Sequence, residues 1–121
     1  MSLSPPVVLS FAASDPSGGA GLQADLLTLA GMGCHPLSVV TALTVQDTSG
    51  VESIHVVERD WVARQARCVL AETPVAAFKL GVLGSAANAA AIARMSACRP
   101  APPVGSEAAN VRTTGGEDSM R

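Results

Sequence analysis

Three short segments carry the residues whose types and spacing could do chemistry. The first is the loop Asp15–Gly21 (DPSGGAG), which leads into a helical pattern with Asp25 one turn inside it. Backbone N–H groups at a helix N-terminus can bind an anion or a polar ligand edge. A carboxylate beside an apolar helix stripe is costly unless it serves a partner. We therefore expect Asp15 and Asp25 to have a functional role; the alternative is an ordinary strand-to-helix turn capped by Asp15.

The other two segments each end an apolar run that is typical of a buried strand. In the segment TVQD, the amide of Gln46 offers a donor and an acceptor, which suits paired hydrogen bonds to the edge of a heterocycle. Taken alone, Gln46 is more simply a solvated loop amide. In the segment KLGVL, Gly81 permits close backbone approach and Val82 could line a pocket. Lys79 is a lone charge in this apolar run, and the simpler alternative to a role in the site is a lysine at the sheet edge that extends to water.

Several functional classes conflict with the sequence. The loop fits neither GxGxxG nor GxxxxGK followed by Ser or Thr, so dinucleotide and P-loop sites are excluded. A net charge of −2 argues against a nucleic-acid surface and a polybasic membrane surface. The three cysteines are widely spaced and form no CxxC, which predicts structural thiols, no metal site and a reducing cytoplasm. These segments hold no Ser-His-Asp or Cys-His set, so we assign no catalytic residue.

The elements that must position these segments follow from the apolar periodicity. Four runs are predicted as strands, namely Val7–Ala13, Leu37–Val45, Val51–Val57 and Val75–Leu80. Three segments are predicted as helices, namely Ala20–Gly31, Asp60–Glu72 (N-cap Asp60) and Ala86–Met95 (N-cap Ser85). The order β-α-β-β-α-β-α indicates an α/β fold with a doubly wound, mainly parallel sheet. Ligands bind beyond the carboxyl ends of such strands, where the three segments fall.

The composition changes near the end of the last predicted helix. Residues 1–95 contain all of the Leu, Ile and aromatic side chains, whereas residues 96–121 are rich in Ser, Pro, Gly and Ala and show no periodicity. We therefore expect one domain over 1–95 and a disordered tail over 96–121. A frameshift or a wrong gene boundary after residue 93 would explain the break.

At the three segments the sequence resembles the hydroxymethylpyrimidine/phosphomethylpyrimidine kinases of thiamine biosynthesis, which have the ribokinase-like fold. The text that carries the resemblance is SFAASDPSGGAGLQADLLTLAGMGCHPLSVVTALTVQDTSGV (Ser10–Val51) and AAFKLGVLGS (Ala76–Ser85). The loop SDPSGGAGLQAD is long and specific, and TALTVQDT follows it at the expected distance. The resemblance covers about residues 5–95 and implies the N-terminal part of such a kinase domain.

The resemblance also implies an activity and a site. It implies phosphoryl transfer from ATP, with Mg²⁺, to the hydroxymethyl group of an aminopyrimidine and then to the resulting phosphate. By motif, Asp25 would hydrogen-bond the hydroxymethyl group and Gln46 would pair with the pyrimidine edge. The pocket would be lined by Ala13, Ala20 and Val82, with Asp15 in the loop beside them. The family often has Gly where Ala13 stands and Met where Val82 stands.

Length sets this sequence apart from the family. Kinases of the family are more than twice as long, and their distal half carries the nucleotide site and an anion hole at a helix N-terminus. This sequence has no match to that half, so we expect a truncated chain that is inactive alone. A non-catalytic pyrimidine-binding fragment and a vitamin kinase like pyridoxal kinase are the alternatives. Family members are often dimers, so the resemblance leaves a homodimer open.

Overall fold

The computed structural model describes residues 4–97 and 112–113. The strands are β1 (Val7–Ser14), β2 (His35–Gln46), β3 (Val51–Val56), β4 (Ala77–Leu80) and β5 (Arg112–Thr113). The helices are α1 (Gly21–Gly31), α2 (Arg59–Glu72) and α3 (Ala86–Ala97). All seven elements expected before residue 96 are present, and their ends lie within two residues of the predicted ends.

The strands form one sheet in the order β3-β2-β1-β4-β5, with β1 at its centre. Strand β1 pairs in parallel with β2 and β4, and β3 pairs with β2 as an antiparallel strand at the edge. The sequence of β1 is apolar except for two serines, which suits this central position because a strand covered on both faces has no solvent-facing polar side. The mainly parallel α/β sheet is confirmed.

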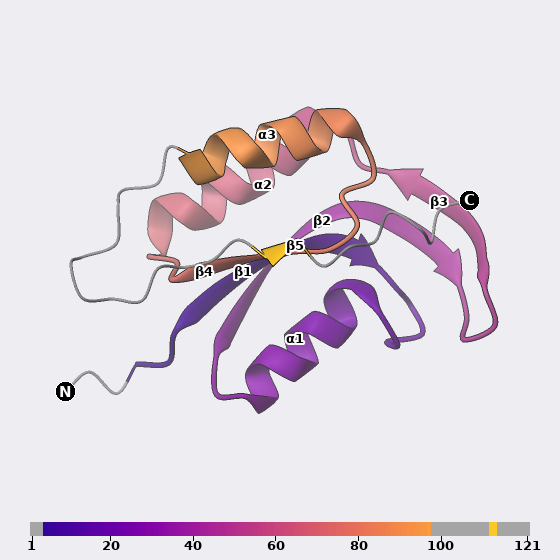
Figure 1. The fold of residues 1–121 in the computed structure, drawn as a ribbon, viewed down its shortest axis with the longest axis horizontal. Coiled ribbons are helices and arrows are strands. Elements are labelled where there is room, and N and C mark those ends of the chain that lie inside the picture. Colours follow the sequence, from indigo (N-terminus) through magenta and orange to yellow (C-terminus); the bar gives the residue numbers. More distant parts are fainter. Residues whose placement is uncertain (1–3, 98–111, 114–121) are drawn as a thin grey trace.

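Helices cover both faces of the sheet (Figure 1). Helix α1 packs on one face against β1 and β2, and α2 and α3 lie together on the other face. The main core lies between the sheet and α2 and α3, and its buried members are Leu9, Phe11, Val39, Val62, Ala66, Phe78, Leu80 and Ile92. Because strand residues alternate between faces, Ser10 and Lys79, which pair across β1 and β4, face the α1 side. The polar residues of the central strands therefore gather under α1.

The two expected helix caps have different outcomes. Ser85 caps α3, because its Oγ accepts a hydrogen bond from the Asn88 N–H at 3.1 Å. Asp60 does not cap α2: the helix begins at Arg59, and Glu58 is its N-cap residue. Asp60 instead lies in the first turn, where its carboxylate pairs with Arg59 at 3.4 Å and complements the positive end of the helix dipole.

The expected unstructured tail falls only partly within the described residues. Ser96 and Ala97 complete α3, and Arg112 and Thr113 form β5, which pairs in parallel with Lys79 and Leu80 of β4. The open edge of a strand offers backbone N–H and C=O groups that can pair with a segment of almost any sequence. The composition of residues 96–121 therefore does not predict β5. Residues 98–111 and 114–121 lie outside the described residues. Among the described helices, none is long and apolar enough to cross a membrane.

Candidate functional site

The carboxylate of Asp15 closes the loop that follows β1. Its Oδ1 accepts hydrogen bonds from the N–H of Ser17 at 2.8 Å and from the Ser17 hydroxyl at 2.7 Å. Its Oδ2 accepts one from the N–H of Ala20 at 2.9 Å, directly before α1. Asp15 is 3% exposed. The carboxylate of Asp15 therefore bonds the N–H of the N-cap residue of α1 and folds the loop back on itself.

These contacts also set the ionisation of Asp15. The hydroxyl of Ser17 is the main cause that holds the pKa of Asp15 below its ordinary value. Burial acts in the opposite direction, and the backbone N–H groups of Ser17, Ala20 and Gly19 lower the pKa further. Asp15 is therefore ionised at neutral pH, and its charge is stabilised by the loop that it closes.

Gln23 and Thr44 hold the end of β1 against this loop, and the sequence analysis missed Gln23. The Gln23 side chain accepts from the N–H of Asp15 at 2.8 Å and donates to the Ser14 hydroxyl at 2.7 Å. The Thr44 hydroxyl donates to the Ser14 carbonyl at 2.7 Å. One feature of the sequence could have indicated the role of Gln23: it is an amide in the first turn of α1. Few other side chains in that turn can form hydrogen bonds with the preceding loop.

Gly21 allows the start of α1 to pack directly on β1. Its φ is +61°, and a Cβ at this position would lie 2.3 Å from the carbonyl oxygen of Ala13. No other residue type fits both conditions. Ala13, 7% exposed, therefore lies under the first residue of α1.

Asp25 lies between α1 and the sheet and contacts two adjacent strands. Its Oδ2 accepts a hydrogen bond from the hydroxyl of Ser10 at 2.8 Å, and its Oδ1 forms an ion pair with Nζ of Lys79. The side chains of Asp25 and Lys79 are 12% and 30% exposed. The alternative of a lysine that simply extends to water does not describe Lys79, because the carboxylate of Asp25 on α1 pairs with it. We call Ser10, Asp25 and Lys79 the α1 triad.

The α1 triad lies before the carboxyl end of the sheet. Ser10 precedes Ala13 by three residues, which is about 10 Å along a strand. Both oxygens of Asp25 already accept from the chain, so a substrate hydroxyl would be an additional donor to this carboxylate. The role of Asp25 as a ligand of the hydroxymethyl group stays a prediction.

Val82 and Gln46 reach the same end of the sheet from β4 and β2. The carbonyl of Val82 accepts a hydrogen bond from the hydroxyl of Thr41 at 2.6 Å. Thr41 is an extra residue in β2, because Ala12 pairs with residue 40 and Ala13 pairs with Ala42. After this bulge Gln46 shares the face of Ala42, and it is half-buried at the end of β2.

The six predicted site residues are thus gathered to different degrees. Ala13, Asp15 and Ala20 meet in the closed loop after β1, and Val82 joins the same end of the sheet through the β2 bulge. Gln46 lies four residues beyond Ala42 along β2. Across residues 4–97, no cluster of three His, Cys, Asp or Glu side chains could hold a metal ion.

Comparison with known families gives this arrangement a context. Residues 15–104 match the family model described as phosphomethylpyrimidine kinase. The chain belongs to the phosphomethylpyrimidine kinase family. A hydroxymethylpyrimidine/phosphomethylpyrimidine kinase of Mycobacterium tuberculosis is 48% identical over 91 residues, which are 75% of this chain and 33% of that protein. The thiamine biosynthesis multifunctional protein ThiED of Corynebacterium efficiens is 40% identical over 110 residues, 91% of this chain and 15% of that protein.

Solved structures of this family and of pyridoxal kinases have the same fold. The phosphomethylpyrimidine kinase of Clostridium difficile matches with a TM-score of 0.70 and 36% identity, over 74% of this chain and 38% of that one. An ADP complex of Bacillus subtilis pyridoxal kinase matches with a TM-score of 0.69 and 26% identity, over 75% of this chain and 36% of that one. The expected ribokinase-like fold is confirmed. The chain spans about a third of the length of the hydroxymethylpyrimidine/phosphomethylpyrimidine kinases that it matches.

Proposed function

We propose that this chain forms the pyrimidine-binding part of a hydroxymethylpyrimidine/phosphomethylpyrimidine kinase, which phosphorylates an aminopyrimidine from ATP in thiamine biosynthesis. One observation carries the proposal. The loop DPSGGAG is closed by the chain itself through Asp15 at the carboxyl end of the central strand, inside the segment that matches the family. A loop that is ordered in this way loses little entropy when a small ligand binds.

The proposed roles follow from the chemistry of each side chain. The Gln46 amide donates to and accepts from the polar edge of the pyrimidine ring. Ala13, Ala20 and Val82 provide small apolar contacts around the ring, and Asp15 holds the loop rather than the ligand. Asp25 orients the hydroxymethyl group. ATP supplies the phosphoryl group when it is bound.

Titration calorimetry with hydroxymethylpyrimidine tests the proposal. We expect the 121-residue chain to bind it, and Gln46→Ala to weaken the binding by roughly 5- to 150-fold, which corresponds to about 1–3 kcal/mol for an unmatched polar ligand edge. Glu52→Ala, an exposed change in the same hairpin, is the control and leaves the affinity unchanged. An unchanged affinity in Gln46→Ala would remove Gln46 from the site, and no binding by the unmodified chain would contradict the proposal.

Pyridoxal is the second candidate ligand, because the Bacillus subtilis pyridoxal kinase is nearly as similar in fold as the phosphomethylpyrimidine kinase. The same titration with pyridoxal distinguishes the two, since we expect tighter binding of the aminopyrimidine. A cytoplasmic location, a homodimer and the inactivity of the isolated chain stay predictions.

A further inference from the structure

The loop between β4 and α3, residues Gly81–Ser85, is held by hydrogen bonds at four of its five positions. The Gly81 N–H donates to the Phe11 carbonyl at 2.8 Å, and a Cβ on Gly81 would lie 2.9 Å from that of Ala12. Gly84 has a φ of +85°, and a Cβ there would lie 3.2 Å from the Thr41 carbonyl oxygen. The carbonyls of Val82 and Leu83 accept hydrogen bonds from side chains, and the Ser85 hydroxyl accepts one from a backbone N–H of α3.

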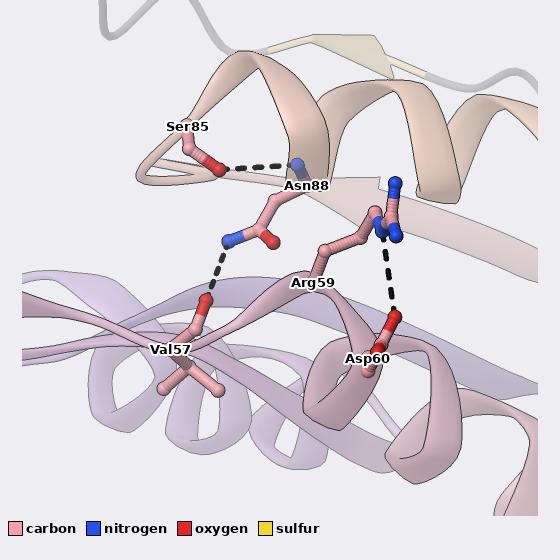
Figure 2. A network of polar contacts seen from close by, with 5 residues as sticks. All are labelled: Val57, Arg59, Asp60, Ser85 and Asn88. Atoms are coloured by element: carbon pink, nitrogen blue, oxygen red, sulfur yellow. Dashed lines mark hydrogen bonds and ion pairs between the residues drawn. The ribbon is translucent and has the colours of Figure 1, made fainter.

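Two fully buried polar side chains outside the predicted site provide the side-chain contacts. The Thr41 hydroxyl donates to the Val82 carbonyl at 2.6 Å, and Thr41 is 0% exposed. The Asn88 side-chain amide donates to the Leu83 carbonyl at 2.9 Å and to the Val57 carbonyl at 3.0 Å, and Asn88 is also 0% exposed. Figure 2 shows Asn88 reaching from α3 down to Val57, where the chain leaves β3.

The orientation of the Asn88 amide is fixed by these partners. Its nitrogen faces two carbonyls, so the flipped amide would place an acceptor against two acceptors. Within the described part of the chain, its Oδ1 is buried and has no hydrogen-bond partner. The free-energy cost of this unpaired acceptor offsets part of the stabilisation from the two donated hydrogen bonds. The main effect of the side chain is therefore to select one conformation of the loop.

We propose that Thr41 and Asn88 are positioning residues that fix the Gly81–Ser85 loop, and with it Val82, against the bulge of β2 and the exit of β3. Because Val82 is a proposed pocket residue, the affinity for the pyrimidine depends on both side chains, and this part rests on the proposed function. Neither residue contacts the ligand. Their effect is to keep the loop in the binding conformation before the ligand arrives.

NMR relaxation of the ¹⁵N-labelled 121-residue chain tests the positioning role without any ligand. We expect the backbone order parameters of residues 82–84 to fall from about 0.85 toward about 0.6 in Thr41→Val, which keeps the side-chain shape. Thr41→Ser keeps the hydroxyl and the rigid loop. Val62→Ala removes buried methyl groups from the core against which Leu83 packs and serves as the matched control, because it destabilises the fold but removes no hydrogen bond to the loop.

Asn88→Leu provides an independent test, since it removes the two donors from α3 rather than the one from β2. A loop that stays rigid in both Thr41→Val and Asn88→Leu overturns the proposal, and so does equal loosening in Val62→Ala. Calorimetry with hydroxymethylpyrimidine then tests whether the conformation of the loop affects the affinity for the ligand. A tenfold weaker affinity in Thr41→Val with full affinity in Thr41→Ser supports the link to binding. If the unmodified chain does not bind, the proposed function fails and the relaxation data alone decide the positioning role.

Discussion

The Lys79→Met variant removes the ammonium group that faces Asp25 and keeps most of the side-chain length. It leaves the carboxylate of Asp25, whose side chain is 12% exposed, with the hydroxyl of Ser10 as its remaining partner in the α1 triad. A buried charge that loses its counterion is costly, because the protein solvates it less well than water does. We therefore expect the fold to lose stability.

The size of the effect follows from the exposure of the two side chains. Removing one partner of a fully buried ion pair costs about 3–5 kcal/mol, and an exposed pair contributes about 0–1 kcal/mol. The Lys79 side chain is 30% exposed and that of Asp25 is 12% exposed, so we expect a loss of about 2 kcal/mol in the free energy of unfolding. In a domain of this size, such a loss lowers Tm by roughly 8–16 °C.

Urea unfolding of four chains forms the assay: the unmodified chain, Lys79→Met, Asp25→Asn and the double variant. Asp25→Asn should cost less than Lys79→Met, about 1 kcal/mol, because the more exposed ammonium that it leaves behind can reach water. The double variant leaves no uncompensated charge, so its loss should be smaller than the sum of the two single losses by about 1–2 kcal/mol.

Two results would refute this reasoning. Equal losses in the two single variants would show that Asp25 is not the more deeply buried partner. Strict additivity in the double variant, within about 0.5 kcal/mol, would show that the pair behaves as independent surface charges.

Two further predictions concern the loop after β1. The folded pKa of Asp15 lies below its unfolded value, so its contribution to stability is present above that unfolded value, about 3.9, and is lost as the pH falls through the folded pKa. Acid unfolding followed by circular dichroism should therefore show a weaker pH dependence in this range for Asp15→Asn, and an unchanged profile would contradict the assigned contacts. Gly21→Ala should cost about 3 kcal/mol or more, because its Cβ meets the Ala13 carbonyl at a positive φ. Gly31→Ala, with nothing within 4 Å of its Cβ at the end of the same helix, should instead be neutral or stabilising in thermal melts.

The sequence predicted the elements of the fold because local signals determine them. The run Val7–Ala13 is apolar except for Ser10, which is typical of a strand covered on both faces, and the Gly and Pro residues near the end of α1 stop that helix where expected. Ser85 was recognised as a cap for the same reason, since the hydroxyl and the N–H that it accepts are three residues apart. The N-cap predicted at Asp60 is wrong because α2 begins at Arg59, one residue earlier, and the preceding Glu58 takes the N-cap position.

The contacts that depend on strand register could not be predicted. Lys79 and Asp25 are 54 residues apart, and they meet only because β4 pairs with β1 so that Lys79 lies opposite Ser10. The roles of Thr41 and Asn88 depend on the bulge in β2 and on the path of the loop after β4, and no local pattern indicates either. The candidate ligand residues, by contrast, were identified from motifs that resemble those of the kinase family. The hydrogen bonds that Asp15 accepts from Ser17 and Ala20 explain why an aspartate stands in this loop.

The extra residue Thr41 in β2 has a consequence for insertions and deletions. In a regular strand, each residue added or removed turns all later side chains to the opposite face. Thr41 is different because it is the extra residue of a bulge, so its deletion would keep Ala13 opposite Ala42 and leave Gln46 on its present face. A relative whose strand lacks this residue would therefore retain the motif TVQD and its orientation, and it would lose the hydroxyl that bonds to the Val82 carbonyl. The length of β2 before Ala42 is thus diagnostic of the contact to Val82 rather than of the glutamine.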